Sequence, residues 1–449
     1  METNDESQSH LQRLRDQLDS GRMRSARQLV RSLSGTELAR LLESLPPNER
    51  AIIWEMIPRE DEGDVLVEIA EEVRDALIQG MDTEELLAAT EGMELDDLAD
   101  LVSGLPEALT QQVIHSLDLQ DRERLQQVLA YDEDSAGGLM NTDTITVRPD
   151  VTLDVVLRYL RLHSEIPDGT DMVFVVNRTD EYLGALYVPR LLTNDPAKTV
   201  AEVMSRDIQP ITVHTSSEEV ARVFENRDLF SAPVVNEHNH LVGRITVDDV
   251  VDVIREQAEH SFMSAAGLDE DDDMFAPATK SARRRAIWLG INLATAFLAA
   301  SVVDIFQTTL DKIVLLAVLM PVVPSMGGVA GTQSLTIITR AMALGQVDRA
   351  NAQRILHKEL LVGVLNGLGW ALVVALVTVL WFNEWRLGAV IASALAVNMI
   401  IAAGAGFAVP LALKKMRIDP AIAGGVVLTT ITDVVGYMTF LGLGTAILL

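Results

Sequence analysis

The chain has 449 residues and no cysteine, and it carries a formal net charge of −29 although 48% of its residues are hydrophobic. The absence of cysteine excludes disulfides, thiolate metal sites and thiol catalysis, and the acidic balance argues against a nucleic-acid partner, which requires a basic surface. Residues 281–449 hold 12 Lys/Arg and 7 Asp/Glu, a net of +5, which leaves a net of −34 for residues 1–280. We therefore predict an acidic soluble half followed by an apolar half, with roughly two to four domains in all.

Residues 1–135 are predicted to form an all-α, solenoid-like N domain. Leucines recur at spacings of three and four, the period of a helix with one buried face. Residues 38–47 (LARLLESLPP) resemble residues 98–107 (LADLVSGLPE), and each copy closes on Leu-Pro, where proline disfavours further helix. Repeated helix pairs of this kind stack into a solenoid. Residues 1–10 are polar and acidic, so we expect no cleavable signal peptide.

An acidic stretch, residues 94–100, overlaps the start of the second copy of this repeat. It contains Asp96, Asp97 and Asp100, and a helix would place Asp96 and Asp100 one turn apart on a single face. From the residues alone, a solvated face is favoured over a binding site.

From residue 137 the pattern changes to short β-branched runs that alternate with helices, and two copies of the order β-α-β-β-α can be read. They occupy residues 136–200 and 201–252. Thr246 and Asp249 close the second copy, and the plainest interpretation is that Thr246 begins the next helix. The predicted strands are 145–147, 172–176, 182–186, 211–213, 232–235 and 241–246, and the predicted helices are 153–162 and 217–226.

Residues 253–280 are predicted to hold a connecting helix and an acidic linker. The helix begins near Asp249 and extends to about Met263, and residues 269–273 (DEDDD) precede Pro277. A charge run of this kind is typical of a solvated linker.

The domain 281–449 contains five apolar runs, each long enough to cross a bilayer with about 20 helical residues. Lys and Arg concentrate in the loops on one side, which the positive-inside rule assigns to the cytoplasm. The acidic half is then cytoplasmic and the C-terminus is outside. The runs are 286–307, 313–339, 360–382, 387–413 and 421–449; the basic residues on the first side are Arg283, Arg284, Arg285, Arg340, Arg349, Arg354, Lys358, Lys414, Lys415 and Arg417, and those on the other are Lys312 and Arg386.

The second run is rich in helix-breaking residues. It contains Pro321 and Pro324, followed by Gly327, Gly328 and Gly331. Irregular backbone at bilayer depth is tolerated where it is buried in protein or lines a water-filled cavity. A small-xxx-small pair also packs two helices closely, so this segment alone leaves a pore and simple packing equally open. Asn292, Asn366 and Asn398 are expected to be interhelical hydrogen-bonding residues.

The last run carries a carboxylate near its middle. Residues 429–436 read TTITDVVG, and Asp433 lies at a depth where an ionised side chain costs several kcal/mol unless it faces a bundle interior or water. A cation is the natural ligand of such a group. The alternative is a packing or capping role among the neighbouring threonines.

Taken together, these features resemble the MgtE family of magnesium channels. The resemblance rests on the helical N domain, on AGGLM at 136–140, on the paired β-α-β-β-α units, which resemble CBS domains, and on five spans. The membrane motifs that match are WLGINL at 288–293, the proline- and glycine-containing segment that ends at Gln333, DPA at 419–421, and the run around Asp433.

The resemblance implies a homodimeric magnesium channel, not an enzyme, in the bacterial plasma membrane. It implies a pore on the two-fold axis, and metal-sensing acidic groups that close the channel when internal Mg²⁺ is high. It also implies ATP binding through Thr246 and Asp249. The implied ion path is Asp433, Pro321, Gly327, Gly328, Gly331, Gln333 and Thr432, and the implied sensor ligands are Asp96, Asp97, Asp100, Asp228, Asp249 and Asp252.

The chain departs from the family pattern in three respects. Val329 stands where the family has asparagine, which removes an amide from the predicted ion site, and Pro324 is an additional proline. Gln257, His260 and Ser261 replace acidic residues near the end of the connecting helix, so weaker or partly pH-dependent gating is expected there. Two alternatives stay open: a channel for Co²⁺ or Mn²⁺, and a membrane-anchored Mg²⁺ or nucleotide sensor without transport.

Overall fold

The computed structural model describes residues 12–14, 22–162, 166–167, 169–265, 268, 273–348, 350–416 and 418–449. The interpretations made above for residues 1–10 and 269–272, and for Arg349 and Arg417, lie outside the described residues. The chain divides into two compact units, each described by itself: Met1–Ala258 with Asp271–Ala276, and Glu259–Glu270 with Pro277–Leu449.

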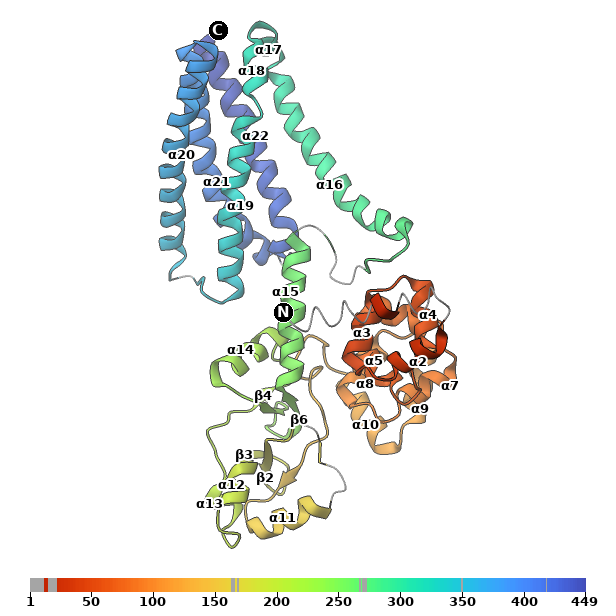
Figure 1. Cartoon of the computed structure of the whole chain (residues 1–449). Helices are drawn as coiled ribbons and strands as arrows, with labels where there is room; N and C mark the ends of the chain where they lie inside the picture. Colours follow the sequence, from red (N-terminus) through yellow and green to blue (C-terminus); the bar gives the residue numbers. More distant parts are fainter. Residues whose placement is uncertain are drawn as a thin grey trace. The chain divides into compact units, whose positions relative to one another are not determined.

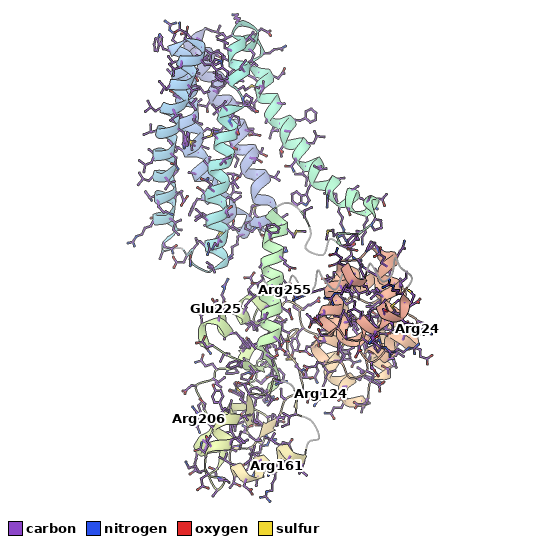
Figure 2. The ribbon with its side chains drawn as sticks, viewed as in Figure 1. Arg24, Arg124, Arg161, Arg206, Glu225 and Arg255 are labelled. Carbon is purple, nitrogen blue, oxygen red and sulfur yellow. The ribbon has the colours of Figure 1, made fainter. Side chains whose placement is uncertain are left out.

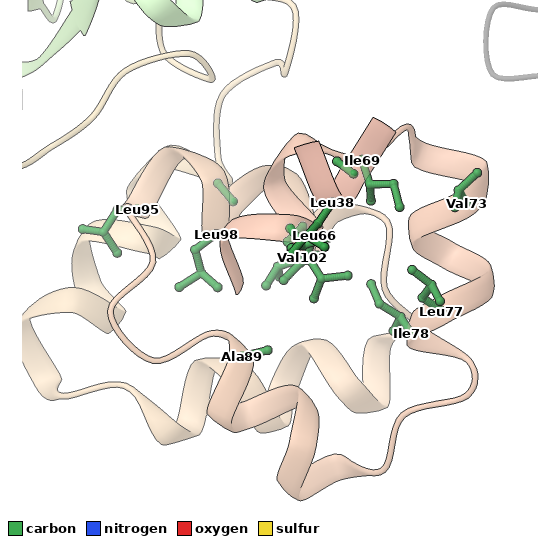
Figure 3. Packing of buried hydrophobic residues seen from close by; sticks show 14 of the residues in the cluster. Leu38, Leu66, Ile69, Val73, Leu77, Ile78, Ala89, Leu95, Leu98 and Val102 are labelled. Atoms are coloured by element: carbon green, nitrogen blue, oxygen red, sulfur yellow. The ribbon is translucent and has the colours of Figure 1, made fainter. Parts of the chain in front are cut away.

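The N domain is all-α, as predicted (Figure 1). Leu38, Leu66 and Val102 meet at the centre of its apolar core (Figure 3). Ser34 begins one helix with a capping box, because its hydroxyl accepts from the Glu37 amide while the Glu37 carboxylate accepts from the Ser34 amide. The helices are α2 Met23–Val30, α3 Gly35–Glu43, α4 Pro47–Trp54, α5 Glu62–Glu68, α6 Glu71–Ile78, α7 Thr83–Ala89, α8 Leu95–Ser103, α9 Glu107–Ser116 and α10 Leu119–Val128.

Two three-stranded sheets follow, and both repeat the predicted β-α-β-β-α order. In each sheet the first strand runs parallel to the second and the second antiparallel to the third. The first unit contains β1 Thr146–Val147, α11 Leu153–Leu162, β2 Met172–Val176, β3 Tyr182–Tyr187 and α12 Val188–Thr193. The second, preceded by α13 Val200–Val203, contains β4 Ile211–Thr212, α14 Ser217–Arg227, β5 Ser231–Val235, β6 Leu241–Thr246 and α15 Val247–Ala265.

In each β-α-β-β-α unit, the segment before the first strand pairs with the other β-α-β-β-α unit. Asn141 bridges to Arg244 of β6, although residues 136–140 were assigned to the first unit from the sequence. Ser205 bridges in turn to Ala185 of β3. This exchange joins the two units into one pair.

The second compact unit contains five helices long and apolar enough to cross a membrane, which confirms the five predicted spans. The second span breaks at Met320 and Pro321 into two helices, and its glycine-rich part stays helical. Helices α19, α21 and α22 pack against one another, and α20 packs against α21. The helices are α16 Ala278–Ile305, α17 Gln307–Lys312, α18 Val314–Leu319, α19 Val322–Ala343, α20 Ala352–Phe382, α21 Trp385–Lys415 and α22 Pro420–Leu448 (Figure 1).

Candidate ion path and acidic surface

Asn398 of α21 lies where α19, α21 and α22 meet. Its side chain is fully buried, and its Nδ2 donates to the carbonyl of Val323 at 2.9 Å. A Cβ added at Gly327 of α19 would lie 2.2 Å from this nitrogen, and one at Gly436 of α22 would lie 3.1 Å from it. Gly327 is therefore required because the Asn398 amide occupies the space that a side chain would need, and a side chain at Gly436 would be tight against both Asn398 and Pro324, whose Cγ is 3.0 Å away. The prediction that Asn398 bonds between helices is confirmed.

Gly331 also serves close packing. A Cβ there would lie 2.9 Å from Leu428 of α22, and a Cβ at Gly406 of α21 would lie 2.7 Å from the Gly331 carbonyl oxygen. Gly328 is less crowded, since its nearest neighbour is the Thr432 hydroxyl at 3.9 Å. Because α19 continues through all three predicted glycines, they let helices approach without unwinding the backbone.

Asp433 is half-buried on a face of α22 that also carries Thr429 and Tyr437 at one-turn spacing. Thr432 points elsewhere: it is buried, and its hydroxyl donates to the Thr429 carbonyl of its own helix at 3.0 Å. Of the predicted path, the single chain leaves Asp433, Pro321 and Gln333 accessible and buries Gly327, Gly331 and Thr432 in helix packing.

Helix α19 has an exposed polar face in spite of crossing the apolar domain. The face is interrupted by Val329, whose side chain is 57% exposed. Polar groups at bilayer depth normally face a protein neighbour or water and not lipid. The exposed polar residues of this face are Ser325, Thr332, Gln333 and Thr336.

Glu359 of α20 is a buried carboxylate that the sequence analysis missed. It accepts a hydrogen bond from the Ser334 hydroxyl of α19 at 2.8 Å and one from the Lys358 ammonium at 3.2 Å. The third apolar run was predicted to begin at residue 360, whereas α20 begins at Ala352. Had the third predicted helix been extended toward its N-terminus by two turns, it would have included Glu359.

The predicted sensor residues of α8 lie close to α15. Asp96 is 8% exposed, and its Oδ1 is buried with no hydrogen-bond partner among the described residues. Burial, reinforced by the charge of Asp249, raises the pKa of Asp96 to about 8. Burial and Glu94 raise the pKa of Asp97 to about 7, and burial with Glu133 does the same for Asp100. The structure thus brings Asp96 and Asp97 of α8 close to Asp249. The prediction of a solvated face is wrong for Asp96, which is buried, whereas the side chain of Asp100 is exposed, as that prediction expected.

Asp228 and Asp252 are not part of this group in the described structure. Asp228 is exposed and ends α14 in a left-handed conformation, with φ of 51°. Asp252 is exposed and pairs with Arg255 at 3.2 Å on α15. Figure 2 labels Arg255 on this helix. Within the described ranges, no three His, Cys, Asp or Glu side chains converge as ligands on one point.

Thr246 and Asp249 form the start of α15. The Thr246 amide and hydroxyl both donate to Asp249 Oδ2 at 2.9 Å. This is a helix cap, as the plainest interpretation expected. Burial raises the pKa of Asp249 to about 6, and the two hydrogen bonds from Thr246 oppose part of that rise.

His260, near the end of α15, contacts the start of α22. Its Nε2 lies 2.8 Å from Asp419 Oδ2, while Asp419 Oδ1 accepts from the Ala421 amide at 2.8 Å. A side chain near the end of α15 therefore contacts Asp419, the residue that caps α22, the helix that carries Asp433.

Fold and site define a membrane protein of five spans, with a close-packed three-helix centre and a carboxylate in its last span, preceded by an acidic part that contains a helical domain and paired β-α-β-β-α units. The family models that match are described as a divalent cation transporter, over residues 320–443, as the MgtE intracellular N domain, over 33–134, and as a CBS domain, over 200–256. The chain is 32% identical to the magnesium transporter MgtE of Thermus thermophilus over 79% of this chain and 80% of that relative. It is 28% identical to the magnesium transporter MgtE of Bacillus subtilis over 96% and 95% of the two chains.

The chain belongs to the MgtE family, as its motifs predicted. Among solved structures, it is similar to the cytosolic domain of the Mg²⁺ channel MgtE in complex with ATP, with 30% identity and a TM-score of 0.49 over 54% of this chain and 98% of that one.

Proposed function

We propose that this protein is a homodimeric channel that admits Mg²⁺ through a bacterial plasma membrane, with its acidic half in the cytoplasm. The observation that carries the proposal is Asp433, a half-buried carboxylate in the last span of a chain from a family of divalent cation transporters. The exposed polar face of α19 and the Thr429–Asp433–Tyr437 face of α22 are surfaces that a second copy and a water-filled path would cover. A two-fold axis would present two Asp433 carboxylates, which match the charge of one Mg²⁺ ion.

Mg²⁺ dehydrates reluctantly, so two carboxylates suit an ion that keeps its waters and is held loosely enough to leave. The membrane potential supplies the driving force: a divalent cation gains about 4.6 kcal/mol on crossing ~100 mV into an inside-negative cell. No coupled hydrolysis is required, and the sequence contains no Walker A pattern.

Closing is proposed to depend on Mg²⁺ at the acidic surface between α8 and α15. The unpartnered Oδ1 of buried Asp96, facing the charge of Asp249, supports a cation there. A divalent ion would offset the repulsion among these carboxylates and hold the N domain against the second CBS unit. Asp228 and Asp252 are proposed as further ligands at the outer side of the same unit.

ATP is proposed to bind at Thr246 and Asp249. Gly169 lies beside this pair, since a Cβ there would be 3.8 Å from the Thr246 methyl group. Both Thr246 donors are already engaged by Asp249, so Asp249 is the group that remains to accept from a ribose hydroxyl. Titration of the full-length protein with ATP, compared with Asp249→Asn, tests this: equal affinity for both would reject the site.

The function is tested by Mg²⁺ flux into liposomes that contain only this protein, under an inside-negative potential. We expect uptake that falls when millimolar Mg²⁺ is present on the side of the acidic half. Absence of flux would reject transport and favour the anchored sensor, for which exposed Val329 on the polar face of α19 is the supporting observation. Co²⁺ and Mn²⁺ as competitors identify the preferred ion.

A further inference from the structure

Three side chains of the N domain donate a hydrogen bond to a backbone carbonyl near the end of the preceding helix. Arg50 Nε donates to the Leu42 carbonyl at 2.8 Å, and Arg122 Nε donates to the Ile114 carbonyl at 2.9 Å. Thr110 makes the same contact with Val102 at 3.3 Å, and in all three pairs the acceptor lies eight residues earlier. The shared contact gives carbonyls at a helix end a side-chain donor, in addition to the amide of Leu45 that donates to Leu42 and the amide of Leu105 that donates to Val102.

Arg50 has an additional partner that the other two positions lack among the described residues. Its two terminal nitrogens bind Asp273 in a bidentate pair, with Nη1–Oδ2 at 2.6 Å and Nη2–Oδ1 at 2.7 Å. The Arg50 side chain is 3% exposed and that of Asp273 is 8% exposed. A desolvated, two-point pair of this kind is strong and orients both groups.

The residues around Asp273 extend the contact. The Asp273 amide donates to Glu72 Oε2 at 2.8 Å, and the Phe275 ring lies 5.8 Å from the Arg50 guanidinium carbon. Asp273 was predicted to lie in a solvated linker, and for this residue that prediction is wrong. A charge run gives no sign that its last member has a buried arginine as its partner.

This contact is close in sequence to the first span. Pro277 follows Asp273 by four residues and is the N-cap of α16, the first span. Four residues reach at most about 14 Å, so a fixed Asp273 limits how far the start of α16 can move away.

We propose that the N-domain surface formed by Arg50, the carbonyls of Leu42 and Glu43, and Glu72 is a docking site for the segment Asp273–Phe275 of the same chain. Through this contact, a movement of the N domain changes the position of the start of the first span. The pair is formed in the same arrangement that brings the acids of α8 to Asp249. Breaking it therefore weakens the closed arrangement, a consequence that rests on the proposed function.

The contact is tested with spin labels at Ile52→Cys and Met274→Cys in the full-length protein, which has no other cysteine. Both positions are exposed, at 42% and 82%. We expect one short, narrow distance distribution that broadens in Asp273→Asn, a change that leaves the caps of Arg50 intact. Arg122→Gln is the matched control and should leave the distribution unchanged. An equally narrow distribution in Asp273→Asn, or a broad one before any change, would overturn the docking site.

Mg²⁺ flux then tests the coupling. In Asp273→Asn we expect half-closure to require about tenfold more Mg²⁺ on the side of the acidic half, with Arg122→Gln unchanged. An unshifted concentration together with a broadened distance would overturn the coupling. Failure of the unsubstituted protein to close with Mg²⁺ would reject the proposed gating instead, and the distance measurement would still decide the docking site.

Discussion

Asn398 restricts the size of the residues that can occupy two positions on neighbouring helices. Its amide fills the space above Gly327 and Gly436, and its bond to the Val323 carbonyl fixes the amide there. A buried polar group without such a partner would destabilise the helix bundle. These two glycines are therefore explained by close packing in a continuous helix, with no need for unwound backbone.

Gly327→Ala is expected to destabilise the protein by roughly 1–3 kcal/mol, because the added methyl group overlaps the Asn398 amide. Thermal unfolding of purified protein in detergent measures the effect. Gly369→Ala is the matched control, since a Cβ there meets nothing within 4 Å. Equal melting temperatures for the two variants would contradict the assigned packing, and partial recovery in Gly327→Ala/Asn398→Ala would support it.

Glu359 permits a second prediction at this scale. Glu359→Ala leaves the buried Ser334 hydroxyl without its acceptor and should cost about 1–3 kcal/mol, whereas Glu359→Gln keeps an acceptor and should cost less. The same unfolding assay separates the variants. If alanine and glutamine were equivalent, the Ser334 bond would contribute nothing measurable.

At the scale of elements, α8 and the start of α15 meet as two acidic surfaces. The raised pKa values of Asp96, Asp97 and Asp249, at about 8, 7 and 6, mean that the assembled arrangement binds protons more tightly than separated helices would. Stability gained from these protons is present below the raised pKa values and is lost as the pH rises through them.

Without Mg²⁺, protection of the acidic half from protease should therefore be greater at pH 6 than at pH 8. Added Mg²⁺ should restore protection most strongly at pH 8, where the carboxylates are ionised. Asp96→Asn removes one of the repelling charges, so its pH dependence should be flatter. Cleavage that is slower at pH 8 than at pH 6 would contradict the linkage.

Local patterns were enough to predict most elements. The period of leucines, the β-branched runs and the apolar stretches depend on neighbours within a few residues, and they placed the N domain, both CBS units and the five spans. Contacts between distant segments were not predictable in the same way. Nothing near Asp273 indicates Arg50, and nothing near Asn141 indicates that it pairs with Arg244 of β6.

In the candidate site too, features that depend on local sequence could be predicted, and features that depend on contacts between helices could not. Asp433 could be predicted because an acid in an apolar run is unusual by itself. The buried position of Thr432 depends on how α22 is rotated against α19, which its own sequence does not specify. Glu359 was missed because the end of a span is marked only weakly by hydropathy.

At the scale of the whole molecule, the proposed dimer requires the Asp433 face of α22 to approach its copy. Thr429→Cys, one turn before Asp433 on this face, should form a disulfide-linked dimer in membranes under mild oxidation. Leu372→Cys is the control, since this residue of α20 is 74% exposed on a surface expected to face lipid. Cross-linking through position 372 but not 429 would place the two-fold axis elsewhere.

The central claim is that the permeating ion passes Asp433. The most direct measurement is the initial rate of Mg²⁺ uptake into liposomes by Asp433→Asn, beside Asp304→Asn, which removes a carboxylate near the end of α16. The account predicts that Asp433→Asn lowers uptake by at least about tenfold while the protein folds and dimerises normally, and that Asp304→Asn is unchanged. Unaltered Mg²⁺ uptake by Asp433→Asn would contradict it.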